Sequence, residues 1–372
     1  MKRLVLCGGG HTHVEVLRRF GLRPVPGVEL VLVSPNRFTP YSGMLPGLVA
    51  GHYGFDAVHL DLERVTHFAG AEFRQTLVTG FDPRRRVVTL ADGATVAFDV
   101  ASLDVGSRPP TDGIPGAEEH AIGVKPVEPF LRVWDRWLER ARAGALARLA
   151  VVGGGAAGVE ALLSMRHRVG RETGRADAVE CHLVTDDDRV LPDHGARAQA
   201  IFRRVLAERG VELHLASRVV RVEAGAVHAA NGLVVRADAI VWATGAAPLP
   251  LLRASGLALD AAGFVAVNDR LQSTSHGHVF AAGDCATIVG HPRPKSGVYA
   301  VREGPPLAAN LRAALAGRPL VGYVPQKHVL ALISTGNRYA VASRGRFAVA
   351  GAWVWWWKDW IDRRFVRRYA TL

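Results

Sequence analysis

The sequence predicts an α/β protein with two domains that each build a parallel sheet around a nucleotide-binding turn, plus a small C-terminal α+β tail. Two glycine-rich turns, at Gly8 and at Gly153, each follow a short apolar strand and precede a helix. A third turn, at Gly283 and Asp284, also follows an apolar strand. At 372 residues the chain is long enough for two or three domains of ordinary size.

The composition is that of a globular protein, because 49% of the residues are hydrophobic and 22% are charged. No apolar run reaches the roughly 20 residues that a membrane-spanning helix needs. The N-terminal apolar run covers only Leu4–Cys7, so we interpret it as a strand rather than a signal peptide and expect a cytoplasmic protein. The net charge is +12, but no zinc-finger spacing or aromatic–basic module accompanies it, so no nucleic-acid partner is expected.

The first turn lies in "KRLVLCGGGHTHVEVLRRF", where Gly8 and Gly10 let the backbone approach a pyrophosphate. The helix that follows offers free N–H groups to the same anion. His13 stands at the third glycine position of G-x-G-x-x-G, and we expect it to pack or to contact a phosphate. The next strand ends at Ser34 instead of the usual acid, and this hydroxyl is expected to bind a ribose.

The second turn matches G-x-G-x-x-G in full, with Gly153, Gly155 and Gly158 in "ARLAVVGGGAAGVEALLSM". The following strand ends in a run of acids, of which Asp186 is the candidate ligand of a ribose diol. A carboxylate there repels a 2′-phosphate, so NADH is favoured over NADPH. Two turns of this kind predict two Rossmann-like dinucleotide-binding domains, and electron transfer between two nucleotides is the natural reason for both.

The cysteines do not suggest redox or metal chemistry. Cys7, Cys181 and Cys285 are far apart and form no C-x-x-C pair, which indicates a reducing compartment and argues against a structural zinc site. His11 and His13 flank a helix start but do not converge on one ion. No metal site is therefore predicted.

Three further segments carry a resemblance to a known group of flavoproteins. These are "HVFAAGDCATI" with Gly283 and Asp284, "ADAIVWATGAAPLP" with Thr244 and Gly245, and "FDVASLDVGSRPP" with Gly106 and Ser107. In this order the motifs resemble those of the pyridine nucleotide-disulfide oxidoreductase superfamily. The resemblance implies FAD and NAD(P)H as cofactors, with all six of these residues at the nucleotide sites.

Within that superfamily the chain is similar to the type II NADH dehydrogenases. "FTPYSGMLPGLVAGHY" and "WKDWIDRRF" look like the NADH-dehydrogenase-like domain found fused to selenide, water dikinases. The disulfide reductases of the superfamily need a cysteine pair, and the corresponding "PYSGMLPGLVAG" has none. The resemblance implies a FAD-binding domain, expected at 1–118 and 246–320, that is split by an inserted NAD(P)-binding domain at 119–245. The C-terminal tail is expected at 321–372.

Hydride transfer from nicotinamide to flavin needs stacking and proximity rather than an acid or a base. Lys295 and the helix start near Gly297 are candidates to place positive charge beside the reduced flavin, although Lys295 also fits a surface residue. By resemblance, Glu160 contacts the nicotinamide side, and Pro40 and Tyr41 lie near the flavin ring. The alternatives are a first-turn helix acid for Glu160 and an ordinary loop aromatic for Tyr41.

The C-terminal segment predicts an amphipathic helix at Trp353–Arg368. Aromatic residues recur about every four positions from Trp353 to Tyr369, and Lys358, Asp359 and Asp362 are expected on the remaining face. An aromatic face with a basic flank is typical of a helix lying on a membrane surface, in this case the inner face. The alternative is a helix packed on the flavin domain or on a second copy in a homodimer.

The sequence therefore predicts a FAD-dependent NAD(P)H dehydrogenase that passes electrons to a quinone-type acceptor. One alternative is a soluble reductase of a small carrier or of a selenium or sulfur compound. Another is a non-catalytic flavoprotein that senses NADH. The glutamines that type II dehydrogenases place at the quinone site are absent near "GVYAVREG", so the acceptor rests on the family and the tail.

Overall fold

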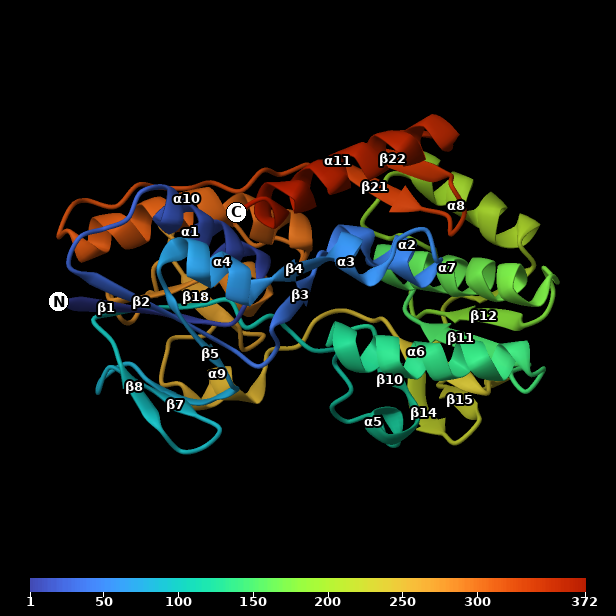
Figure 1. Ribbon diagram of the computed structural model, residues 1–372. Coiled ribbons are helices and arrows are strands. Elements are labelled where there is room, and N and C mark those ends of the chain that lie inside the picture. Colours follow the sequence, from blue (N-terminus) through green and yellow to red (C-terminus); the bar gives the residue numbers. More distant parts are fainter.

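The computed structural model describes residues 1–372 and has two lobes, each built on a five-stranded, all-parallel sheet (Figure 1). The strands of both sheets are nearly continuous apolar runs, such as "KRLVLC" and "RLAVV", because each sheet is covered on both faces. The α/β class with two dinucleotide-binding units is thus confirmed. The expected domain limits remain predictions.

The sheet of the first lobe has the strand order β19-β9-β1-β2-β5. Its strands are β1 (Lys2–Cys7), β2 (Val28–Ser34), β5 (Glu72–Gln75), β9 (Val100–Leu103) and β19 (Val279–Ala281). Strand β19 comes from far along the chain and pairs with β9 at Val279 and Ala101, so the chain leaves this lobe and returns to it.

Helices pack on one face of the first sheet and a three-stranded antiparallel sheet lies on the other (Figure 1). The helices are α1 (His11–Leu22), α4 (Leu62–Ala69) and α10 (Gly297–Leu315). The opposite layer consists of β6 (Val78–Asp82), β7 (Val87–Leu90) and β8 (Thr95–Ala97). The lobe is completed by α9 (Pro250–Ala254), β18 (Val265–Val267) and β20 (Ala286–Ile288).

A segment of the first lobe reaches across to the second. It contains β3 (Phe38–Pro40), the 3-10 turn Ser42–Met44, α2 (Leu45–Val49), α3 (Phe55–Val58) and β4 (His59–Asp61). Helix α2 packs on α7 of the second lobe, where the Arg171 guanidinium donates to the carbonyl of Gly51 at 3.3 Å. The two lobes therefore touch away from the linkers as well.

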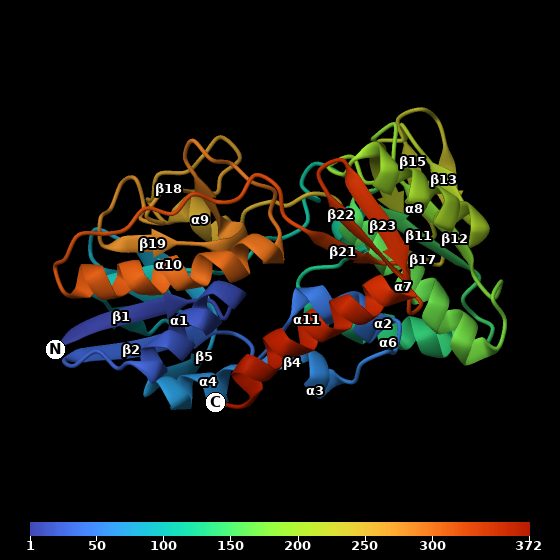
Figure 2. The ribbon, with the colours of Figure 1, turned by 90° about the horizontal axis from the view of Figure 1, so that it is seen from above.

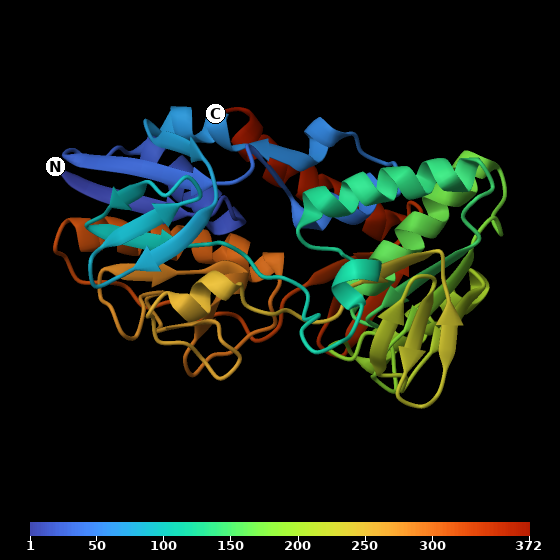
Figure 3. The ribbon, with the colours of Figure 1, turned by 90° about the horizontal axis from the view of Figure 1, so that it is seen from below.

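The sheet of the second lobe has the order β10-β17-β11-β12-β13. Its strands are β10 (Ile122–Gly123), β11 (Arg148–Val152), β12 (Glu180–Val184), β13 (Val211–His214) and β17 (Ala239–Trp242). The helices α6 (Val127–Arg142), α7 (Ala156–Thr173) and α8 (Ala196–Glu208) share one apolar cluster with one face of this sheet. The other face carries β14 (Val219–Glu223), β15 (Ala226–Ala229) and β16 (Val234–Arg236), with the short α5 (Ala117–His120) beside them (Figure 3).

The C-terminal tail joins the two lobes (Figure 2). Strands β21 (Ala331–Ser334), β22 (Ala340–Arg344) and β23 (Phe347–Gly351) form an antiparallel sheet against α7 and α8 of the second lobe. Helix α11 (Ala352–Ala370) then runs back over β4 and α3 of the first lobe. No helix is both long enough and apolar enough to cross a membrane.

Candidate active site

The glycine turn after β1 closes around a buried carboxylate that the sequence interpretation missed. Oδ2 of Asp104 accepts the backbone N–H groups of Thr12 at 3.0 Å and of His13 at 3.2 Å, so it caps the first turn of α1. A Cβ on Gly10 would lie 2.2 Å from this oxygen, and one on Gly8 would lie 2.3 Å from the Asp104 backbone carbonyl. Burial raises the pKa of Asp104 to about 7, although the two N–H groups oppose the shift.

A second group of charged residues lies where β19 ends. Oδ2 of Asp284 is 2.5 Å from Nζ of Lys125 and 3.3 Å from Oγ of Ser107. Lys125 lies in the second lobe, between β10 and α6, and "GVKP" was the only sequence signal for it. Gly283 adopts φ +66°, and a Cβ there would lie 2.4 Å from Oδ1 of Asp104.

Helix α10 contributes a third carboxylate to this cluster. Oε2 of Glu303 accepts the N–H of Gly283 at 2.7 Å, and burial raises the pKa of Glu303 to about 7. Asp104 and Asp284 add to that increase through their charges, while Lys295 opposes it. The turn of Gly283 is therefore fixed to α10 by a buried carboxylate.

One cavity of about 1540 Å³ connects the two nucleotide-binding units. It runs past the first glycine turn, the end of β9 and the end of β19, and it reaches Ala156 and Ala157 in the first turn of α7. It exceeds the ordinary size of a small-molecule pocket, roughly 300–1,000 Å³. Nε2 of His11 is buried without a protein partner on the wall of this cavity.

The predicted site residues divide into those that line this cavity and those that do not. The residues on its wall are Gly8, Gly10, Ser34, Pro40, Gly106, Ser107, Glu160, Asp284, Lys295 and Gly297. The residues away from its wall are His13, Tyr41, Gly153, Gly155, Gly158, Asp186, Thr244, Gly245 and Gly283. Most of the second group shape the second glycine turn and its surroundings.

The second turn has the geometry that its glycines require. Gly153 adopts φ +123°, and a Cβ on it would lie 2.5 Å from the carbonyl of Ala243. A Cβ on Gly158 would lie 2.0 Å from the carbonyl of Gly153, so helix and strand are in close contact here. Gly155, at the start of α7, faces open space, which leaves the helix N-terminus free for a phosphate. Asp186 is exposed just after β12.

Three of the predicted site residues make their contacts within the protein, and for His13 this is the packing role that the sequence allowed. His13 is fully buried, with Nδ1 2.7 Å from the carbonyl of Gly8 and Nε2 2.8 Å from Oγ of Ser102. Its ring therefore packs α1 onto the sheet and does not line the cavity. Burial lowers the pKa of His13 to about 4. Tyr41 stacks on Phe365 of α11, with ring centroids 4.3 Å apart.

The third of these, Lys295, is on the cavity wall, but its ammonium is engaged by the protein. Nζ donates to Oγ1 of Thr287 at 2.8 Å and to the carbonyl of Ala286, and it lies 4.1 Å from the ring centroid of Phe264. Burial lowers the pKa of Lys295, while nearby acids oppose the shift.

Glu160 sits at the junction of the second lobe and the tail. Its Oε1 accepts the N–H of Ser334 at 2.6 Å, and burial raises its pKa to about 7 against the opposing charge of Lys358. A partly buried acid of this kind, on the wall of a cavity, is a candidate for contact with a polar ligand.

The faces of α11 differ from the expected ones. Lys358, Asp359 and Asp362 are buried rather than exposed, and Nζ of Lys358 lies 2.5 Å from Oδ2 of Asp362. The aromatic stripe is divided, because Phe365 and Tyr369 are buried in the first lobe. Four tryptophans, which we call the tryptophan patch, are 38–58% exposed: Trp353, Trp356, Trp357 and Trp360.

The first glycine turn and the first turn of α7, the helix that follows the second glycine turn, line one cavity, and this arrangement is typical of an oxidoreductase that binds two nucleotides. The family model described as pyridine nucleotide-disulphide oxidoreductase matches residues 2–304, and the chain belongs to this family. FAD and NAD(P)H are its cofactors, and the protein is an FAD-dependent NAD(P)H oxidoreductase. The Gly8–Gly10 cradle and the unpartnered nitrogen of His11 fit a dinucleotide in the first lobe.

Individual proteins are similar to this chain over most of its length. The NADH dehydrogenase-like protein YutJ of Bacillus subtilis is 24% identical over 331 residues, which are 88% of this chain and 87% of that protein. The demethylphylloquinone reductase NdbB of Synechocystis is 27% identical over 351 residues, 90% and 85% of the two chains. The solved sulfide:quinone oxidoreductase of Aquifex aeolicus superposes with a TM-score of 0.83 at 18% identity, covering 100% of this chain and 92% of that one, and it shares the fold.

Proposed function

We propose that this protein oxidises NADH through its flavin and delivers the electrons to a quinone at a membrane surface. The observation that carries the proposal is the single cavity that joins the first glycine turn to the first turn of α7. A hydride donor and its acceptor must come into contact, and a shared cavity allows that. The name of the Synechocystis relative, a demethylphylloquinone reductase, supports a quinone as the acceptor.

The residues of the chain would bind and orient the two nucleotides. The turn at Gly8–Gly10 and the N-terminus of α1 would hold the pyrophosphate of FAD, and Asp284 with Ser107 would hold its polar chain. FAD, when bound, supplies the ring that accepts a hydride from NADH. The N-terminus of α10, at Gly297, lies on the cavity wall and would offer partial positive charge to the bound cofactor.

The second lobe would hold NADH. Gly155 leaves the start of α7 open for the pyrophosphate, and Glu160, fixed by the N–H of Ser334, would contact the nicotinamide end. Asp186 is exposed where a ribose diol would lie, which favours NADH over NADPH.

The tryptophan patch is the proposed membrane contact. Its four rings are exposed to solvent. On the opposite face of α11, Phe365 stacks on Tyr41, which lies near the cavity. The guanidinium of Arg364 lies 5.4 Å from the ring centroid of Trp360, so a cation accompanies the aromatics. Aromatic rings and cations together suit the headgroup region of an anionic membrane. The protein would then be peripheral on the inner membrane face, either alone or as a homodimer.

The other predicted activities are less well supported. All three cysteines are buried and free, and burial raises the pKa of each thiol to about 12, so none is a thiolate nucleophile for sulfur or selenium chemistry. A non-catalytic NADH sensor would show slow flavin reduction. The finer resemblance, to the domain fused to selenide, water dikinases, remains a prediction.

The experiment compares NADH oxidation with a water-soluble quinone and with a long-chain quinone held in anionic vesicles. A variant with Trp353, Trp356 and Trp360 changed to alanine should keep its rate with the soluble quinone. With vesicles it should lose at least about tenfold, since burying such rings supplies more than the 1.4 kcal/mol that a factor of ten needs. Val234→Ala, at an exposed apolar side chain of the second lobe, is the control. Equal vesicle rates for variant and wild type would refute the membrane contact, and no activity with either quinone would refute the acceptor.

A further inference from the structure

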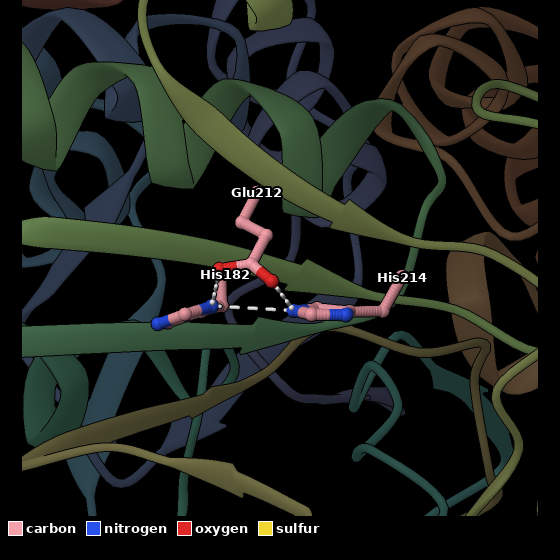
Figure 4. Close-up of side chains that lie close together, drawn as sticks. All are labelled: His182, Glu212 and His214. Atoms are coloured by element: carbon pink, nitrogen blue, oxygen red, sulfur yellow. Dashed lines mark hydrogen bonds and ion pairs between the residues drawn. The ribbon is translucent and has the colours of Figure 1, made fainter. Parts of the chain in front are cut away.

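Three potential metal ligands meet on two neighbouring strands of the second lobe, away from the residues of the cavity wall (Figure 4). His182 lies on β12, and Glu212 and His214 lie on β13. The parallel register pairs His182 with Glu212, and His214 is two residues further along the same strand. Side chains two residues apart point to the same face of a sheet, so all three gather on one face.

The nitrogens of the two histidines and the carboxylate of Glu212 lie at separations close to those that one metal ion requires. Nδ1 of His182 is 3.2 Å from Nε2 of His214 and 3.3 Å from Oε2 of Glu212, and Nε2 of His214 is 3.7 Å from the other carboxylate oxygen, Oε1. A tetrahedral ion with bonds of about 2.0–2.1 Å separates its ligand atoms by about 3.3 Å. One oxygen of Glu212 and the two nitrogens lie within 4.8 Å of one another, so a small adjustment of these side chains would let them bind one ion.

The surroundings of His182 are those of a ligating histidine. Its other ring nitrogen, Nε2, is buried without a hydrogen-bond partner and lies 3.2 Å from Oε1 of Glu180, so a small rotation of that carboxylate would let it accept the N–H. Histidines that bind metals usually present their second nitrogen to a carboxylate, which fixes the tautomer and directs the free lone pair at the ion. In this structure Nδ1 of His182 and Nε2 of His214 face each other, and both lie near the carboxylate of Glu212.

The burial of the three residues also suits a metal site. His182 is buried and His214 is partly buried, whereas Glu212 is exposed and leaves an entry path.

We propose that His182, Glu212 and His214 form a binding site for one divalent transition-metal ion, of which Zn²⁺ is the reference. A set of two imidazoles and one carboxylate suits zinc, cobalt, nickel or copper better than magnesium or calcium. The ion would join β12 to the edge strand β13. It would also stabilise the turn that carries Asp186, because the N–H of Thr185 donates to the carbonyl of His214 at 3.0 Å.

The test uses the full, flavin-loaded chain without an affinity tag, freed of metal by a chelator. Cobalt(II) is titrated in and followed by visible absorption, and Zn²⁺ is then added. The expected result is saturation at one ion per chain with the intense bands of tetrahedral cobalt, displacement by zinc, and a rise in the melting temperature. Glu212→Ala and His214→Gln should each weaken binding at least about tenfold, and Glu180→Ala should weaken it about 10–100-fold.

The control is His228→Gln, which should bind as the wild type does. His228, on β15, has a single carboxylate partner, Glu223 at 2.9 Å, and so pairs without forming a three-ligand set. Retained flavin absorption and a cooperative thermal transition show that each variant is folded. If His214→Gln is unstable, the metal affinity of Glu212→Ala, a change at an exposed position, serves as the test. The absence of saturable binding, or equal binding by wild type and Glu212→Ala, would overturn the proposal.

Discussion

Nζ of Lys125 lies 2.5 Å from Oδ2 of Asp284, although 159 residues separate the two in the chain. Lys125 lies in the second lobe, between β10 and α6, and Asp284 closely follows β19 of the first sheet. This ion pair therefore joins the two lobes on the wall of the cavity between them.

Replacing Lys125 by methionine should leave the Asp284 carboxylate, whose side chain is only 10% exposed, without its cation. Since a charged group left without its partner costs about 1–3 kcal/mol, we expect the affinity for FAD to fall about tenfold or more. Flavin fluorescence on dilution measures this. Lys327→Met, at an exposed lysine, is the control. Unchanged flavin affinity in Lys125→Met would contradict a role for the pair at the site.

The two glycine turns should respond differently to alanine. Gly10→Ala would bring a Cβ 2.2 Å from the Asp104 carboxylate, so we expect loss of flavin and lower stability. Gly155→Ala meets nothing within 4 Å, so the variant should fold and bind FAD normally while its KM for NADH rises. Gly54→Ala, also in open space and at φ −84°, is the control for both. Normal NADH kinetics in Gly155→Ala would show that α7 does not receive the pyrophosphate.

Asp104 should make stability depend on pH. Its pKa is raised from 3.8 to about 7 in the folded protein, so the folded state holds a proton that the unfolded state has lost. Stability should therefore fall as pH rises from about 4 to about 7 and then level off. Asp104→Asn keeps an oxygen for the N–H groups of Thr12 and His13 but cannot ionise.

The stability of Asp104→Asn relative to wild type should thus increase between about pH 4 and pH 7, as measured by urea unfolding across that range. Glu160, whose pKa is also raised, is present in both proteins and its effect cancels in the difference. Glu303 is coupled to Asp104, so the loss of the Asp104 charge also lowers the pKa of Glu303 and contributes to the measured difference. A difference that does not vary with pH would mean that Asp104 ionises normally.

The buried pair on α11 gives a stability prediction. Lys358→Met leaves Asp362 buried and unpaired, which should cost about 3–5 kcal/mol in the free energy of unfolding. Lys358→Met combined with Asp362→Leu should recover most of that loss, because no buried charge remains. Arg367→Met, at an exposed cation of the same helix, should change stability by less than about 0.5 kcal/mol. An equal loss in single and double variants would show that packing, rather than charge, is responsible.

The sequence predicted the fold where local pattern determines it. Strand–turn–helix units around Gly8 and Gly153 follow from apolar runs and glycines, and the family resemblance supplied the connection between them. The helix at the C-terminus was also predicted, but its faces were not. Periodicity alone assigned Lys358 and Asp362 to solvent, whereas in the structure they neutralise each other in the interior.

Long-range contacts explain the remaining differences. Asp104 stands two residues before Gly106 in "FDVASLDVGSRPP", but its contact with the N–H groups of α1 depends on the fold. Glu212 and His214 are two apart and so predictably on one face of a strand. Their meeting with His182 depends on which strand pairs with which, and no local pattern in the sequence gives that pairing.

Anaerobic stopped-flow mixing tests the central proposal most directly. The flavin-loaded protein is mixed with NADH, the flavin absorption is followed, and a soluble quinone is then added. The account predicts rapid loss of the flavin band with NADH and rapid return with the quinone. No loss of the band with NADH, or a loss that no quinone reverses, would contradict it.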